Sequence, residues 1–172
     1  MSIPGIDSQN WQGLIAEFKN TSDRTNAILG STYLQNHLGN LIGCFFVDHS
    51  DSTSYLLDSD KCLGGFGTRI NVAYALGLIS PNEYHDLMLI FQIRDIFLNE
   101  LHRTQFSNNE IRKKCFQLKI PREIIRPEEA PTPRRLFVFA VTILVRQLTM
   151  RAQQAEDERR IPPDNFMLID LE

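Results

Sequence analysis

Along most of the chain, apolar residues recur every three or four positions, the spacing that turns one face of an α-helix toward a core. Between Ser22 and Asp48 this pattern predicts one long helix, capped by Thr21 or Ser22, and a shorter helix is expected before it at residues 9–19. The alternation of apolar and polar positions that marks β-strands is nearly absent. The pattern therefore predicts an all-α protein.

Two capping boxes mark further helix starts. Residues 80–83, Ser-Pro-Asn-Glu, place a serine at the N-cap, a proline at the first helical position and a glutamate at the third. This box predicts a helix from Pro81 to about residue 102 or 103. A second box at residues 107–110, Ser-Asn-Asn-Glu, predicts another helix through about Leu118.

Glycines, prolines and short polar residues separate these helices. Residues 48–54 are rich in aspartate and serine, whose side chains compete for backbone hydrogen bonds, so they predict a loop. Gly64 and Gly65 are expected to form a tight turn ahead of a helix at residues 68–78. Residues 119–133 contain four prolines and predict an extended connection across the bundle surface.

The last predicted helix starts at Thr132 and Pro133 and ends near Arg159. Within it, residues 136–145 are apolar apart from Thr142, which is about half of the ~20 residues that a membrane span needs. They predict a buried helix, and no membrane segment is expected.

The chain is therefore expected to form a single-domain, up-and-down bundle of about six to seven helices over residues 1–160, in which the helix from Pro81 is the most buried. Residues 161–172 form a C-terminal tail with apolar residues in an acidic frame. We expect a homodimer, formed through this tail or through the last helix, where apolar side chains are available for one face: Phe137, Leu144 and Leu148.

Composition and charge narrow the function classes. The 172 residues suit one domain, and 42% hydrophobic with 23% charged residues are ordinary for a soluble chain. The net charge of −3 lacks the basic excess of a self-sufficient nucleic-acid binder. Composition therefore favours a protein partner over direct nucleic-acid binding.

The cysteines and the amino terminus indicate a cytoplasmic protein. Cys44, Cys62 and Cys115 are an odd number and widely spaced, which is typical of reduced thiols rather than of a disulfide framework or a metal site. Residues 1–11 have neither the basic nor the apolar region of a secretory signal. The glycine-rich segment 64–67 has no preceding strand and no Gly-Lys-Ser/Thr ending, so no cofactor is expected there.

The segment Phe66–Ile93 resembles the mannitol operon repressor family. The family pattern is a glycine and phenylalanine before an arginine, an Ala-Tyr-Ala-Leu-Gly-Leu-Ile run, an acidic residue with Asp-Leu, and Ile-Arg, and these elements stand here in that order. Residues 23–30 resemble the family's amino-terminal helix, and residues 107–118 resemble its segment after Ile-Arg. The resemblance covers about residues 22–151.

This resemblance implies an all-helical, non-enzymatic regulator of transcription in the bacterial cytoplasm, without a recognised DNA-binding module. The sequence agrees on the last point, because the helices on either side of residues 77–80 are largely apolar, whereas a recognition helix needs polar residues that contact bases and phosphates. We therefore expect an unidentified protein partner and no direct contact with nucleic acid.

One departure from the family bears on catalysis. Relatives carry Arg-Asn-x-Phe-Ala-His where this chain has the segment Arg94–Asn99, so asparagine and histidine are replaced by Asp95 and Asn99. The arginine-to-histidine spacing of the relatives is similar to the ribonuclease motif of HEPN domains. A degenerate HEPN-like RNase or antitoxin-type module centred on Arg94 is the alternative function. His102 could replace the missing histidine only with difficulty, because it lies two helical turns, about 11 Å, beyond Arg94, and a general base must lie within hydrogen-bond reach of its target.

Two adjacent charges interrupt the apolar helix at Arg94 and Asp95. Neighbouring residues on a helix point about 100° apart, so each charge is expected to pair with another element rather than with its neighbour. We interpret the cluster as a buried salt-bridge network or, alternatively, as a partner site. Its candidate members are Asp23, Arg24, Arg69, Arg94, Asp95 and Asn99. No catalytic or metal-binding residue is predicted.

Overall fold

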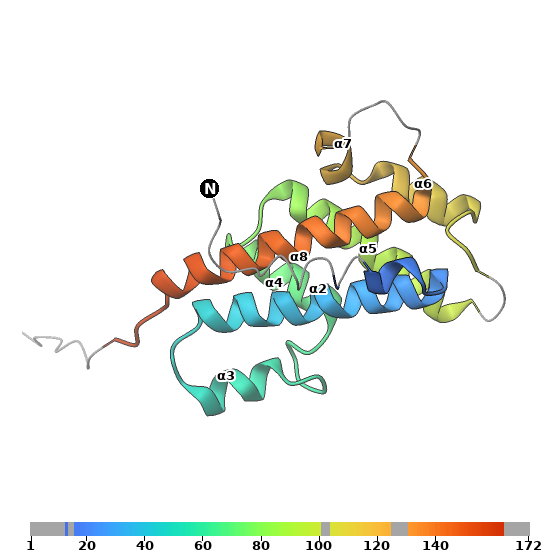
Figure 1. Ribbon diagram of the computed structural model, residues 1–172. Coiled ribbons are helices and arrows are strands. Elements are labelled where there is room, and N and C mark those ends of the chain that lie inside the picture. The colour runs from blue at the N-terminus through green and yellow to red at the C-terminus, as the bar shows by residue number, and fades with distance from the viewer. Residues whose placement is uncertain (1–12, 14–15, 101–103, 125–130, 164–172) are drawn as a thin grey trace, which may run out of the picture.

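A computed structural model describes residues 13, 16–100, 104–124 and 131–163, and this part of the chain contains helices and no strand. Figure 1 shows their arrangement. The all-α prediction is confirmed. The bounded helices are α2 (Asp23–Phe45), α3 (Ser50–Leu57), α4 (Phe66–Ala75), α5 (Pro81–Asn99), α6 (Asn109–Gln117), α7 (Ile120–Ile124) and α8 (Pro133–Asp157).

The two longest helices, α2 and α8, pack along each other as a parallel pair (Figure 1). At their amino-terminal ends, Arg134 Nη1 of α8 lies 2.9 Å from Asp23 Oδ1 of α2. Beyond their carboxyl-terminal ends, the Arg160 amide donates to the Phe45 carbonyl at 3.0 Å. The prediction of a simple up-and-down bundle is therefore wrong for this central pair, because the five helices between α2 and α8 return the chain to the end from which it started.

The core lies between this pair and the helices that cover it. α4 and α5 pack against α2, while α6 and α7 pack against α8. α2 and α8 each contribute more buried residues than α5, so the expectation that α5 is the most buried helix is wrong. The three α8 residues expected on a dimer face are instead fully buried within the subunit: Phe137, Leu144 and Leu148.

The strongest local start signals are confirmed. Ser80 caps α5 with a complete capping box, in which its side chain accepts from the Glu83 amide at 3.3 Å and the Glu83 carboxylate accepts from the Ser80 amide at 2.6 Å. Thr132 caps α8 with a proline in its first turn, and Ser22 caps α2. The second box is displaced by one residue, because Asn108 caps α6 by accepting from the Glu110 amide.

Two short helices stand where the sequence predicted irregular chain. α3 replaces part of the loop at residues 48–54, and the His49 side chain caps it by accepting from the Ser52 amide. α7 interrupts the extended connection, and a buried carboxylate from α5 holds its start: Asp86 accepts from the amides of Lys119 and Ile120 at 2.9–3.0 Å. Partners outside the segment stabilise α7, so its own propensities did not reveal it.

Two glycines are required by the geometry around α4: Gly77, after its carboxyl end, and Gly39, where α2 contacts it. Gly77 follows the last turn of α4 and has a φ of 73°, a backbone conformation that is strained for residues with a side chain. α4 itself spans Phe66–Ala75, slightly earlier than the predicted residues 68–78. Gly39 of α2 lets Arg69 of α4 come close, because a Cβ at Gly39 would lie 2.7 Å from Arg69 Nη1.

α8 is long and apolar enough to cross a membrane by length and composition alone, with a mean hydropathy of 1.2 in its most apolar stretch. Half of that stretch is buried inside the bundle. This burial is typical of the core helix of a folded domain. The predicted division at residue 160 and the tail residues 164–172 cannot be compared with the fold, because the tail lies outside the described residues.

Candidate functional site

Asp23 and Arg24, the first two residues of α2, do not join the predicted polar cluster. The Asp23 carboxylate accepts from Arg134 and, at 2.9 Å, from the Phe106 amide. Arg24 donates to the Glu100 carbonyl. Both side chains fasten segments that are distant in sequence to the amino-terminal end of α2.

Arg69 is buried and serves as a clamp on backbone carbonyls. Its Nε donates to the Leu63 carbonyl at 2.7 Å, its Nη1 donates to the Gln35 carbonyl of α2 at 2.8 Å, and its Nη2 donates to the Leu57 carbonyl at the end of α3. Burial lowers the pKa of this guanidinium. Arg69 therefore ties α3 and the turn after it to the bundle, and among the described residues it has no acidic partner.

Arg94 is half-buried and lies over the Phe66 ring, with 6.0 Å from its guanidinium carbon to the ring centre. Its Nε is buried, and its hydrogen has no acceptor among the residues that the structure describes. Asp95 is half-buried and Asn99 is exposed. Within the described part of the chain, the expected pairing of Arg94 and Asp95 with Asp23, Arg24 or Arg69 is not formed, since those three residues have other partners. His102 lies outside the described residues.

Two polar anchors were missed by the sequence analysis. Arg134 reaches from the start of α8 to Asp23 and to the carbonyls of Phe18 and Thr21, at 3.0 and 2.6 Å. Asp86, fully buried, caps α7 and also contacts His85 Nδ1 at 2.9 Å. The Asp-Leu element of the family pattern singled out Asp86, but only the topology shows which amides it meets.

The α4–α5 hairpin presents no cation suited to nucleic-acid phosphates. From Phe66 to Asn99 the only lysine or arginine residues are Arg69 and Arg94. The first is buried on backbone carbonyls and the second is half-buried against Phe66. Phosphate contacts need exposed lysine or arginine, and neither cation of this helix-turn-helix-like unit is exposed.

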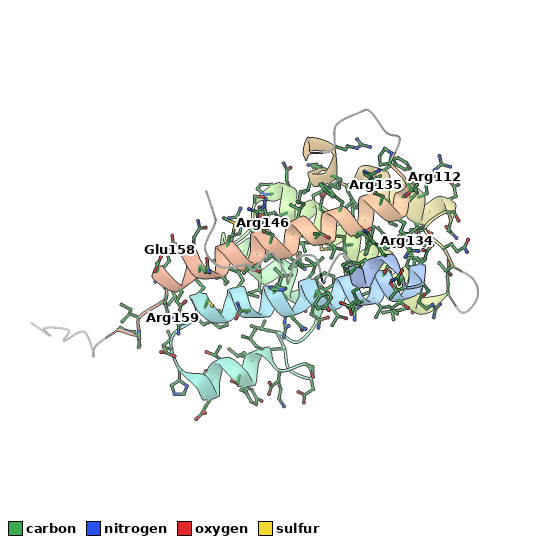
Figure 2. The ribbon with its side chains drawn as sticks, viewed as in Figure 1. Arg112, Arg134, Arg135, Arg146, Glu158 and Arg159 are labelled. Carbon is green, nitrogen blue, oxygen red and sulfur yellow. The ribbon has the colours of Figure 1, made fainter. Side chains whose placement is uncertain are left out.

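Cationic side chains gather instead on α6, α7 and the start of α8. We call this set the cationic surface: Arg112, Lys113, Lys119, Arg122 and Arg135, all exposed. Several are positioned by their own surroundings, since Arg112 lies 5.8 Å over the Phe116 ring and Arg122 donates to the Phe116 carbonyl. In Figure 2, Arg112 and Arg135 lie at the same end of the bundle, opposite Glu158 and Arg159.

Anionic side chains gather on the other side of the central pair. We call residues 48–64 the α3 arm. Its aspartates Asp48, Asp51, Asp58 and Asp60 are exposed, and α3 packs against α2 (Figure 1). α6 and α7 pack on α8 and α5. The fold thus separates charges that nearly cancel in the sequence, where the net charge is only −3.

A shallow groove of about 490 Å³ follows the outer face of α8. We call it the α8 groove, and the described residues that line it are Ile143, Arg146, Gln147, Met150, Arg151 and Gln154. Arg151 pairs with the buried Glu83 of α5 at 2.9 Å. Arg146 is exposed and has no ion-pair partner within the described ranges.

The cysteines and the potential metal ligands are dispersed over the described residues. Among the described residues no group of three or more His, Cys, Asp and Glu is placed to hold a metal ion. All three cysteines are free thiols, and burial raises the pKa of Cys115 to about 12, so its reactive thiolate is disfavoured.

Comparison with known proteins identifies a family model and a solved structure of similar fold. A family model described as "Mannitol repressor" matches residues 31–154. A chain of the X-ray structure of the MtlR–HPr complex from Escherichia coli is 20% identical with a TM-score of 0.64, and the alignment covers 82% of this chain and 96% of that one. No curated protein matches the sequence.

Proposed function

The chain belongs to the mannitol repressor family, and on that premise we propose that it is a bacterial, cytoplasmic and non-enzymatic regulator that acts by contacting other proteins rather than DNA. The observation that carries this proposal is the family match over residues 31–154, which includes most of the described bundle. The HEPN-like alternative gains no support from the described residues, where Arg94 contacts the Phe66 ring and Asn99 is exposed.

The cationic surface is the contact site that we infer. Its side chains are exposed and are spread over the short helices α6 and α7, the link between them and the first turn of α8, whereas a duplex reader inserts one helix into the major groove. The exposed carboxylates of the α3 arm, on the other side of the central pair, repel a phosphate backbone. A folded partner with a compact acidic patch fits this combination better than a long polyanion does.

An HPr-type protein is the first partner to test, because the structural neighbour was solved as an MtlR–HPr complex. Titration calorimetry of the full chain with HPr from the same organism should show saturable binding. We expect the double substitution Arg112→Glu with Arg122→Glu to weaken that binding at least about tenfold, since reversing charges in an interface costs about 1.4 kcal/mol or more. The matched control is Arg160→Glu, an exposed arginine remote from the cationic surface.

The outcomes separate the two modes of action. Unchanged HPr affinity in the double variant, or no binding by the wild-type chain, would overturn the assigned surface and partner. Nanomolar binding of duplex DNA with a steep salt dependence, measured by fluorescence anisotropy, would overturn protein contact as the mode of action. We expect no DNA binding at micromolar protein.

We also propose that the chain forms a homodimer, through a surface other than the α8 face that the sequence predicted. The α8 side chains first expected to form it are internal, so a homodimer must use other residues. Tyr74, in the last turn of α4, and Leu76, the C-cap of α4, are 42% and 39% exposed, and one face of the Tyr74 ring is stacked on Tyr84. Light scattering at tens of micromolar should give twice the monomer mass, and Tyr74→Ser with Leu76→Ser should return it to the monomer mass.

A further inference from the structure

The α8 groove lies on the side of α8 that faces away from α2. Thr149, which contacts His37 of α2, and the core residue Val145 define the inner face. At 100° per residue, Ile143, Met150 and Gln154 fall on the opposite face. Met150 is 40% exposed, so this face presents apolar surface together with the exposed charge of Arg146.

Residues 164–172 have the complementary chemistry. Their sequence is Asp-Asn-Phe-Met-Leu-Ile-Asp-Leu-Glu, which combines three carboxylates with five apolar side chains. Apolar side chains in that number cost free energy when left in water, and carboxylates pair with arginine. The α8 groove offers Ile143 and Met150 to the first group and Arg146 to the second.

The tail starts close enough to reach the groove of its own chain. After α8 ends at Asp157, the Arg160 amide bonds to the Phe45 carbonyl, so the chain leaves on the α2 side. The way back is about 16 Å round the helix and about 10 Å along it to Met150, which combine to about 19 Å, and about six of the twelve residues after Arg160 span that distance when extended. Reach is therefore sufficient, with several residues to spare.

The tether also decides between the same chain and a second copy. A segment of nine residues buries far less than the ~1,200 Å² of a stable interface between proteins. Its contact is weak when it comes from another molecule, but a short tether raises its effective concentration to the millimolar range. Occupancy within the same chain needs only a dissociation constant somewhat below that concentration.

We propose that residues 164–172 fold back and occupy the α8 groove of the same chain, with their apolar side chains against Ile143 and Met150 and a carboxylate on Arg146. In this arrangement the tail covers the outer face of α8. This proposal is independent of the partner that binds the cationic surface.

Hydrogen–deuterium exchange of the full chain tests it directly. Amides of residues 164–172 should exchange about tenfold more slowly than those of a synthetic peptide of the same sequence, the protection that results when the effective concentration exceeds the dissociation constant about tenfold. Arg146→Glu with Met150→Asp should restore the rate of the free peptide, while both substitutions lie at exposed positions and should leave the core amides of α8 protected. Arg122→Glu, on the cationic surface, is the matched control and should leave tail exchange unchanged.

Three results would overturn the proposal. The tail of the wild-type chain could exchange at the rate of the free peptide. Its protection could rise with protein concentration between about 1 and 100 μM, which would assign the groove to a second copy. Finally, the groove variants could change exchange in residues 1–12 and leave the tail unchanged, which would assign the groove to the amino-terminal segment.

Discussion

The α2–α8 pair and the α3 arm differ in what holds them. The pair is joined along its length by fully buried side chains and at each end by a hydrogen bond or ion pair. The α3 arm has no fully buried apolar side chain among its described residues, and Tyr55 is 63% exposed. It is held mainly by hydrogen bonds to its carbonyls, from Arg69 and from Gln35, whose side-chain amide donates to the Gly64 carbonyl at 2.7 Å.

This difference separates two ways of fixing a helix in a small bundle. Apolar burial is non-directional and scales with area, so the α2–α8 pair distributes its stability over many residues. The α3 arm depends on a few directional bonds, so one residue carries much of its attachment. Substitutions should therefore have graded effects in the pair and concentrated effects at Arg69.

The largest effect is expected inside the pair. Leu144→Ala removes a fully buried side chain from α8 and should lower the free energy of unfolding by about 3–4 kcal/mol, the cost of lost apolar transfer and of the cavity. Leu57→Ala, in the half-buried matched position of α3, should cost about 1 kcal/mol. Chemical denaturation measures both, and equal losses would contradict the contrast between the regions.

Arg69→Met should come next, at about 2–3 kcal/mol, because it keeps the length of the side chain but leaves carbonyls of Leu57, Leu63 and Gln35 without their donor. Amide exchange should accelerate in residues 57–64 far more than in α8. A lysine cannot supply the planar set of donors, so Arg69→Lys should recover little of the loss. Uniform acceleration across the bundle would show that Arg69 stabilises the core rather than the α3 arm.

Arg94→Met should cost less than Arg69→Met, since the Arg94 guanidinium lies over the Phe66 ring and makes no ion pair within the described residues. We expect a loss of about 0.5–1 kcal/mol, the size of a partly exposed cation–π contact. The buried pair predicted from the sequence would have cost about 3–5 kcal/mol to break. A loss in that range, measured by chemical denaturation, would show an acidic partner for Arg94.

The smallest expected effect is a pH dependence of stability that arises from His37, where α2 contacts α8. Burial lowers the pKa of His37 from its ordinary value of 6.5, and its Nδ1 lies 3.3 Å from Thr149 Oγ1. Above pH 6.5 the imidazole is neutral in both the folded and the unfolded chain. As pH falls below 6.5 the unfolded chain takes up the proton first, so stability falls until the folded imidazole is also protonated.

Melting temperatures of the wild-type chain and of His37→Gln between pH 5 and 7.5 measure this term by difference. The wild-type chain should lose more stability than the variant over the acidic half of that range. Parallel curves for the two proteins would exclude a contribution from His37.

Local signals predicted the fold well, and long-range polar contacts were beyond them. The starts of α5 and α8 followed from Ser80 and Thr132, since a cap and its helix are neighbours in sequence. α7 was missed because its cap is Asp86, more than thirty residues away. Its dependence on a distant carboxylate is a tertiary effect that no local pattern contains.

The pairing of Arg94 and Asp95 with Asp23, Arg24 or Arg69 was mispredicted for the same reason. The kind of partner that a charge on an apolar helix meets depends on topology. Arg69 found backbone carbonyls, Arg94 found an aromatic ring and Asp23 found Arg134. The family resemblance could not indicate these contacts.

The parallel arrangement of α2 and α8 also sets an order of events during synthesis. α2 lacks its main packing partner until about a hundred more residues have been translated, which takes roughly 5–20 s at ordinary bacterial rates of about 5–20 residues per second. Throughout that interval the apolar stripe of α2 is available to chaperones or to misassembly. A fold with mostly local helix contacts would close its core progressively, whereas this one closes last, when α8 docks, and its folding should be correspondingly slow for an all-helical protein.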